Sequence, residues 1–203
     1  MLRAMASITP RFTADELPRI AARLRSFAIR RLSVDGPRAS VLVPFCRRDG
    51  RDAVLFTKRT ETVGTHKGQV SFPGGRMDPD DVDETACALR ELHEELGISP
   101  SSVEVLGTYH EVMSITSVRV TPVIAWLGDL EKLTILPSPH EIDAVFALTL
   151  DELAHPEKRE IRQLGPRKAP FFTAGPHPVW GLTAFILDEI MRDVLELDIP
   201  PLE

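Results

Sequence analysis

Three glutamates near the middle of the chain, Glu91, Glu94 and Glu95, have the spacing of residues on one face of a helix. At about 100° per residue, positions three and four apart lie within one arc of about 100°. Carboxylates gathered in this way repel one another, and a hard divalent cation, which prefers carboxylate and phosphate oxygens, would hold them together. A solvated acidic helix face is the common alternative. The glutamates alone therefore leave both interpretations open.

A glycine pair shortly before these glutamates favours the first interpretation. The loop Ser71–Pro79 contains Gly74 and Gly75 together with the acidic residue Asp78, and it leads from a predicted strand towards the helix. Glycines allow the backbone to approach the carboxylates and a metal-bound phosphate closely. In such a site the cation neutralises phosphate oxygens and activates water, while a carboxylate serves as base or orients the water. The combined pattern favours hydrolysis of a phosphoanhydride over an ordinary tight turn.

The elements that would position this segment are a mixture of strands and helices. Apolar residues at three- and four-residue spacing predict helices over residues 13–27 and 182–195. The helix with the glutamates is predicted over residues 83–96, and Gly97 ends it. Strands are expected at residues 39–45 and 53–57, which form a hairpin, at 69–72, 103–106, 118–127 and 144–150, and in a second hairpin within 158–175. The order predicts one mixed α/β domain.

Composition places the chain among ordinary globular proteins. Of its 203 residues, 43% are hydrophobic and 27% are charged, which suffices for one domain with a buried core. A formal net charge of −6 argues against a general nucleic-acid binder, which would normally present a basic face. No apolar run approaches the roughly 18 residues of a membrane span. Cys46 and Cys87 lack metal-type spacing. These features predict a cytoplasmic protein that acts on a small molecule, with no nucleic-acid or membrane partner.

The helix with the glutamates also resembles a known motif. Residues 90–98 read Arg-Glu-Leu-His-Glu-Glu-Leu-Gly-Ile, which matches every position in the second half of the Nudix box, Arg-Glu-apolar-x-Glu-Glu-x-Gly-apolar. The resemblance implies a Nudix α/β/α sandwich around a central mixed β-sheet, with extra N-terminal and C-terminal helices. It implies one domain over residues 1–203, with a core at about 38–195 and a helical extension at 1–37. The implied reaction is hydrolysis of a nucleoside diphosphate linked to another group.

The first half of the box departs from the common pattern, as if one residue were inserted. Where a single glutamate is expected, the chain has Val82 between Asp81 and Asp83. The coenzyme A pyrophosphatase subfamily has a box of this length. Its upstream signature resembles residues 55–75, although Gly64 stands where the signature has arginine. This resemblance implies that coenzyme A or acyl-coenzyme A is split into 3′,5′-ADP and 4′-phosphopantetheine or its acylated form.

The resemblance also implies roles for individual residues. The ligands implied for Mg²⁺ or Mn²⁺ are Glu91, Glu94 and Glu95. The catalytic residues would be Arg90, which orients the glutamates by ion pairing, and the candidate bases Glu94, Glu95 and Glu141. Substrate contacts are expected from Arg59, His66, Gly74 and Gly75. Arginine suits bidentate phosphate binding. A surface ion pair is the competing interpretation for Arg59, and a solvated loop position is the one for Glu141.

Two other functions stay open at this point. Another Nudix specificity, such as ADP-ribose or NADH, would use the same chemistry on a different substrate. A Nudix-fold module that senses a nucleotide without hydrolysing it would be expected to lose box glutamates, which this chain keeps. Trp180 and Phe185 are expected in the core, despite the appeal of an aromatic platform for adenine. A homodimer is compatible with the sequence. The sequence also leaves the identity of the catalytic base undecided.

Overall fold

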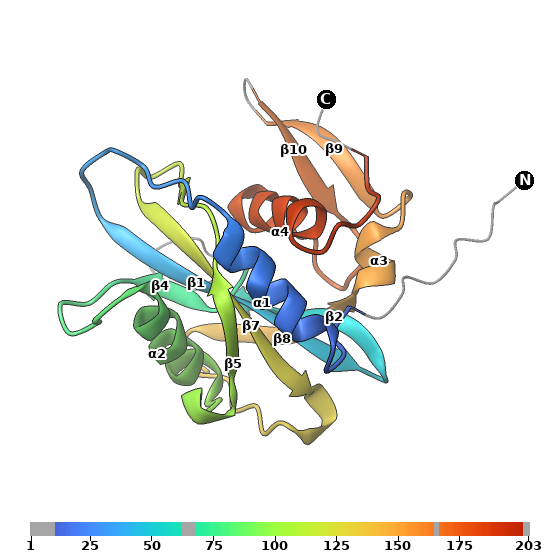
Figure 1. Ribbon diagram of the computed structural model, residues 1–203, viewed down its shortest axis with the longest axis horizontal. Coiled ribbons are helices and arrows are strands. Elements are labelled where there is room, and N and C mark those ends of the chain that lie inside the picture. The colour runs from blue at the N-terminus through green and yellow to red at the C-terminus, as the bar shows by residue number, and fades with distance from the viewer. Residues whose placement is uncertain (1–10, 62–67, 165–166, 201–203) are drawn as a thin grey trace, which may run out of the picture.

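A mixed β-sheet forms the centre of the computed structural model, which describes residues 11–61, 68–164 and 167–200 (Figure 1). Its strands are β1 (Arg38–Arg48), β2 (Arg51–Arg59), β3 (Val70–Ser71), β4 (Gly74–Arg76), β5 (Glu104–Thr108), β6 (Val112–Met113), β7 (Arg119–Asp129) and β8 (Ile142–Thr149). Within these ranges the hydrogen-bonded order is β3-β2-β1-β7-β5, with β4 beside β1, β6 beside β7 and β8 beside β2. A separate hairpin consists of β9 (Arg159–Leu164) and β10 (Arg167–Phe172).

The central strand β1 joins the two halves of the sheet. It pairs antiparallel with β2 across a tight turn and parallel with β7. Its side chains alternate between the two faces, so that Val43 and Phe45 belong to one core cluster, and Leu42 and Cys46 belong to the other. Both faces of the strand are therefore covered, which explains its almost unbroken apolar sequence.

Helices cover both faces of the sheet (Figure 1). The helices α1 (Glu16–Ser26) and α4 (Gly181–Asp193) contribute side chains to the larger core cluster, and α2 (Glu84–Leu96) contributes to the smaller one. The remaining helical segments are α3 (Leu150–Ala154) and the 3₁₀ turns Pro100–Ser102 and Leu130–Lys132. In the described part of the chain, no helix is long and apolar enough to cross a membrane. The α/β sandwich predicted from the sequence is thus observed.

The helix α2 is defined at both ends and along one side. The side chain of Asp83 caps its first turn by accepting a hydrogen bond from the backbone N–H of Ala86 at 2.8 Å. Gly97 ends the helix in a left-handed conformation, with φ of 69°. Leu92 and Leu96 are fully buried against the sheet. Because the apolar side is fixed, the glutamate side is held towards the preceding loop and the end of β2.

Most predicted elements are present, with ends shifted by a few residues. The prediction lacks the strands β4 and β6 and the helix α3, because none of these short segments has an apolar pattern that marks it as a strand or helix. The expectation that Trp180 lies in the core is wrong, since it is 39% exposed at the N-cap of α4. Phe185 is partly buried against the core.

Candidate active site

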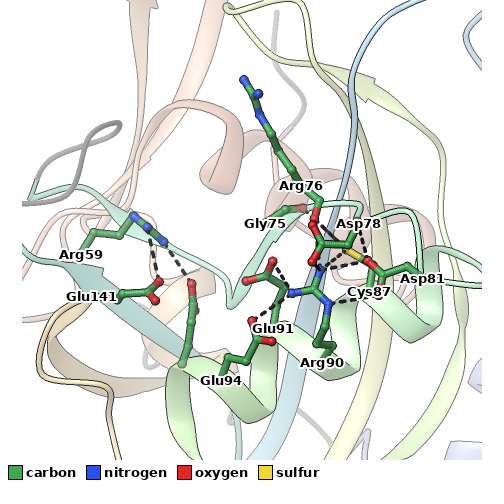
Figure 2. Close-up of polar contacts among 11 residues, drawn as sticks. Arg59, Gly75, Arg76, Asp78, Asp81, Cys87, Arg90, Glu91, Glu94 and Glu141 are labelled. Carbon is green, nitrogen blue, oxygen red and sulfur yellow. Dashed lines mark hydrogen bonds and ion pairs between the residues drawn. The ribbon is translucent and has the colours of Figure 1, made fainter.

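Arg90 lies at the centre of a carboxylate cluster where α2 meets the preceding loop (Figure 2). Its Nη1 donates to Glu91 Oε1 at 3.0 Å and to Glu94 Oε2 at 2.9 Å. Its Nε and Nη2 donate to the two carboxylate oxygens of Asp81 at 3.1 and 2.9 Å. Nη2 also donates to the carbonyl oxygen of Arg76 at 3.2 Å. One guanidinium therefore joins the loop to the helix and holds two of the three glutamates.

The carboxylate of Glu91 lies against Gly75. A Cβ atom on Gly75 would lie 2.3 Å from Glu91 Oε1 and 2.5 Å from Glu91 Cδ. Any residue larger than glycine at this position would therefore clash with the carboxylate in its present position. Gly74 is required for another reason, because its φ is 156° and a Cβ there would lie 2.4 Å from the carbonyl oxygen of Ser40. Burial raises the pKa of Glu91 above its usual value, and the hydrogen bond from Arg90 opposes this rise.

Glu95 is buried, with only 1% of its surface exposed. Arg59, at the end of β2, donates from Nη1 to Glu95 Oε1 at 3.0 Å. Among the described residues, Glu95 Oε2 has no hydrogen-bond partner. Burial raises the pKa of Glu95 to about 8, while the charge of Arg59 acts in the opposite direction. The Nη2 of Arg59 lies 3.8 Å from Glu141 Oε2 (Figure 2), so Arg59 links the helix to the loop before β8.

That loop is attached to the last turn of α2 by backbone hydrogen bonds. The N–H of Leu136 donates to the carbonyl oxygen of Leu96 at 2.8 Å, and the N–H of Ser138 donates to that of Glu95 at 2.8 Å. The carbonyl oxygen of Glu141 accepts from the N–H of Thr60 at 2.9 Å. The final carbonyls of a helix have no partner within it, and here the loop provides one. Glu141 is thereby brought beside the glutamate side of α2.

The donor set of this cluster fits a hard divalent cation. Within residues 11–61, 68–164 and 167–200, no three His, Cys, Asp or Glu side chains are already arranged around a metal position. Nη1 of Arg90 contacts both Glu91 and Glu94 instead. Glu95 nevertheless has a buried oxygen without a partner, and burial raises the pKa values of both Glu91 and Glu95. The cluster therefore offers a buried carboxylate oxygen without a partner among the described residues, and carboxylate oxygens are the ligands that Mg²⁺ prefers.

Comparison with known protein families identifies this arrangement. A family model described as the NUDIX domain matches residues 36–168, a range that contains the glycine pair, the glutamates and Glu141. The chain belongs to the Nudix family. The matched range begins just before β1 and ends within β10, so it also contains the loop that reaches the end of α2.

Individual Nudix relatives cover most of the chain. It is 40% identical over 172 residues to the mitochondrial coenzyme A diphosphatase NUDT8 of Homo sapiens. The aligned residues cover 82% of this chain and 73% of the human protein. The Mus musculus protein of the same name is 39% identical over 182 residues, covering 87% and 83%. A MutT/nudix family protein from Enterococcus faecalis has a TM-score of 0.52 at 16% identity, covering 91% of this chain and 73% of that one. At this identity the structural likeness shows the Nudix fold alone.

In the Nudix box of this chain, the structure distinguishes the two acidic residues that flank Val82. Val82 is 89% exposed, and Asp83 is engaged as the N-cap of α2. Asp81 instead forms the ion pair with Arg90, and the side chain of Asp81 is only 6% exposed. The hydrogen bonds from Arg90 are the main cause that lowers the pKa of Asp81 to about 2. Sequence spacing alone did not single out Asp81, because the insertion shifts the usual register.

Two of the expected substrate contacts, His66 and Gly74, are not shown as contacts by the structure. His66 lies outside the described residues. Gly74 pairs with Val41 across β4 and β1, which places it in the sheet. The assignments of Glu91, Glu94, Glu95 and Glu141, and of Arg59, Arg90 and both glycines, stay predictions. The structure brings together their described members on one side of α2, at the ends of β2 and β4 and the loop before β8.

A methyl group at Gly75 should impair Nudix chemistry while leaving the fold intact. In Gly75→Ala the new Cβ would displace the carboxylate of Glu91, which is the far end of a flexible side chain. We expect turnover to fall by about 10–100-fold, the range typical when the orientation of metal ligands is disturbed. Steady-state rates and a thermal melt of the same preparation would measure the two effects.

Gly74→Ala is the matched comparison. There the new Cβ would meet backbone atoms of Ser40 and Val41, and the residue would keep a positive φ. We therefore expect a lower melting temperature for Gly74→Ala than for Gly75→Ala. Equal activity of Gly75→Ala and wild type would show that Glu91 does not need its present position.

Proposed function

We propose that this Nudix protein hydrolyses the pyrophosphate bond of coenzyme A or acyl-coenzyme A. The products would be 3′,5′-ADP and 4′-phosphopantetheine or its acylated form. The observation that carries the proposal is the identity of about 40% to two proteins named coenzyme A diphosphatase, across more than four fifths of this chain. Residues 55–75 resemble the subfamily signature, which supports the proposal further. Two of these residues lie beside the glutamates, because Arg59 donates to Glu95 and Gly75 lies against Glu91.

The residues of the site suit hydrolysis by water. The reaction forms a bond from a water oxygen to one phosphorus, breaks the bond from that phosphorus to the bridging oxygen, and transfers the proton of the water to a base. A divalent cation, when bound, neutralises phosphate oxygens and lowers the pKa of coordinated water. We assign Glu91, Glu94 and Glu95 as the residues that would hold Mg²⁺ or Mn²⁺. Arg90 keeps Glu91 and Glu94 in place through its ion pairs.

The base is proposed to be one of the carboxylates on this side of α2. Glu95 can hold a proton near neutral pH, because burial raises its pKa to about 8. Arg59 fixes the Oε1 atom of Glu95 and leaves Oε2 available. Glu141 faces the same region through its 3.8 Å approach to Arg59, and Glu94 is half exposed. Arg59 is also proposed to contact the substrate phosphates, since a guanidinium matches phosphate geometry.

The main alternative within the family is a different nucleoside diphosphate derivative, such as ADP-ribose or NADH. The chain has Gly64 where the subfamily signature has arginine, so one expected substrate contact is absent. A non-catalytic nucleotide sensor is disfavoured, because the three box glutamates are present and belong to the cluster around Arg90 and Arg59.

A substrate panel tests the proposal directly. Purified protein with Mg²⁺ or Mn²⁺ should cleave coenzyme A with a kcat/KM at least about tenfold above that for ADP-ribose, NADH or nucleoside triphosphates. This ratio corresponds to about 1.4 kcal/mol of additional transition-state stabilisation. Product analysis should show 3′,5′-ADP. Efficient turnover of ADP-ribose without cleavage of coenzyme A would reject the substrate assignment and retain the chemistry.

The compartment and assembly of the protein stay predictions. Both cysteines, Cys46 and Cys87, are buried and free, which fits the reducing compartment expected from the sequence. The two relatives are named as mitochondrial proteins, so they do not support the cytoplasmic location that the sequence suggested. A single domain with its core at about residues 38–195 is proposed on the sequence alone, with which a homodimer is compatible. A small-molecule substrate is supported by the Nudix family and the two named relatives.

A further inference from the structure

We propose that two copies of this chain associate through the outer edge of β9, which pairs antiparallel with its own copy about a two-fold axis at Ile161. Two β9–β10 hairpins would then form one four-stranded sheet. The hairpin lies beside α4 and away from α2 (Figure 1), so the contact would leave the glutamates of the candidate site uncovered. The proposal does not depend on the proposed function, and its test needs no substrate.

The register of the hairpin fixes which backbone groups point to its outer sides. Along a strand of an antiparallel pair, the N–H and C=O of successive residues point alternately to the partner and away from it. The N–H and C=O of Phe172 bond to Val179 at 2.9 and 3.0 Å, so they point away from β9, and those of Pro170 point the same way. Phe172 is paired with Arg159, and Pro170 with Ile161. The backbone groups of Arg159 and Ile161 therefore point to the outer edge of β9.

The two outer edges of the hairpin differ. Along β10, Pro170 has no N–H to offer, which is a common way to protect a sheet edge. Along β9, the N–H of Arg159 is taken by the carbonyl oxygen of His155 at 3.1 Å. Ile161 has no such partner, since among the described residues β10 is the only strand paired with β9. The edge therefore offers one donor and one acceptor at Ile161 to a further strand.

The side chains of β9 are complementary about an axis at Ile161. There Ile161, which is 38% exposed, would oppose its own copy, and each Glu160 would oppose Arg162 of the other copy. Because the Ile161 pair exchanges the hydrogen bonds, the two flanking pairs are of the kind that brings side chains closest. Opposite charges placed in this way stabilise a strand pair. Within one copy, Arg162 Nε donates to Glu160 Oε2 at 2.7 Å, and both side chains are more than 40% exposed.

Neighbouring positions for the axis do not fit. An axis at Glu160 or at Arg162 would place like charges directly opposite each other, which destabilises a strand pair. The guanidinium of Arg162 lies 3.5 Å from the centre of the Phe171 ring, which holds this charge on its face of the hairpin. A contact along one strand of six residues is small beside the roughly 1,200–2,000 Å² of stable interfaces. We therefore expect a monomer–dimer equilibrium that shifts with protein concentration.

Ile161→Pro tests the backbone contact. The N–H of Ile161 points away from β10, so its loss should leave the hairpin paired and remove both hydrogen bonds between the copies. Since each bond contributes a few-fold, the dimer dissociation constant from sedimentation velocity should rise at least about tenfold. Lys168→Pro is the matched control, because the N–H of Lys168 points to the outer side of β10. It should stay within about twofold of wild type, and thermal melts would show that both variants are folded.

Charge reversal tests the side chains without altering the backbone. Glu160→Arg and Arg162→Glu would each place like charges opposite each other, so neither should dimerise up to about 0.5 mM, where millimolar affinity becomes visible. A mixture of the two variants should dimerise, because every facing pair then has opposite charges. A wild type that stays monomeric at this concentration would leave the edge to a strand of another protein and overturn the proposal. A dimer that persists in both single variants, or that Ile161→Pro and Lys168→Pro weaken equally, would overturn it as well.

Discussion

Glu95→Gln should reduce turnover by more than about 100-fold without destabilising the protein. Residues one step beyond the metal ligands already contribute about 10–100-fold, and Glu95 is proposed to be a ligand and a candidate base. The amide oxygen of glutamine can still accept from Arg59, so the contact at 3.0 Å has a neutral replacement. Burial disfavours the charged form of Glu95. The melting temperature at pH 7 should therefore be unchanged or higher, which a thermal melt beside rate measurements would show.

Glu94→Gln and Glu104→Gln provide the comparisons. Glu94 is half exposed and contacts Arg90, so its loss should also abolish most turnover. Glu104 is an exposed residue of β5, and its replacement should leave turnover within about twofold, as expected of surface substitutions away from special features. Wild-type rates in Glu95→Gln would refute both its metal and its catalytic assignment. A large loss of stability instead would mean that Glu95 has a mainly structural role.

Asp188→Ala should lower the free energy of unfolding by about 3–5 kcal/mol. Asp188 is fully buried in α4, where Oδ1 accepts from Arg159 Nε at 2.7 Å and Oδ2 lies 2.7 Å from Arg192 Nη2. The side chain of Arg159 is only 3% exposed, so removing Asp188 leaves a buried charge without its partner. Breaking a buried ion pair from one side has this magnitude. Since a domain of this size is stable by about 5–15 kcal/mol, the variant approaches the limit of folding.

Chemical denaturation, followed by two independent spectroscopic signals, would measure the difference in free energy of unfolding between wild type and Asp188→Ala. The control is Glu160→Ala, which removes a pair between Glu160 and Arg162 with both side chains more than 40% exposed. Such surface pairs contribute about 0–1 kcal/mol. Comparable losses in Asp188→Ala and Glu160→Ala would mean that the buried cluster does not tie the β9–β10 hairpin to α4. Turnover of folded Asp188→Ala at low temperature should remain close to wild type.

The predictable part of the fold consists of elements whose signals are local. The helix α2 has a capping aspartate, buried leucines and a terminal glycine, so its limits could be read to within one residue. The strand β4 has no such signal. Its three residues form a strand because Gly74 and Gly75 pair with Val41 and Ser40 of β1, more than 30 residues earlier in the chain. Pairing across this separation depends on the assembled sheet, which local patterns do not contain.

The same distinction applies to the site. Arg90, Glu91 and Glu94 lie within five residues of one another, so helical spacing was enough to place them together. The contact between Arg59 and Glu95 spans 36 residues and forms where β2 ends beside the helix. The family resemblance suggested Arg59 as a phosphate contact, but no pattern indicated that it would hold a buried glutamate. The choice of Asp81 over Asp83 likewise depends on the loop conformation, because Asp83 is taken by the helix cap.

The attachment of the loop before β8 to the last turn of α2 has a consequence for local unfolding. Glu95 takes part through its backbone carbonyl as well as its side chain, and the same loop ends at Glu141, whose carbonyl is bonded to Thr60 next to Arg59. Fraying of this helix end would release these contacts in one cooperative event, since segments that share hydrogen bonds open as units. Glu95 and Glu141 would therefore lose their positions together. This would remove the Arg59 end of the site while the ion pairs of Arg90 remain.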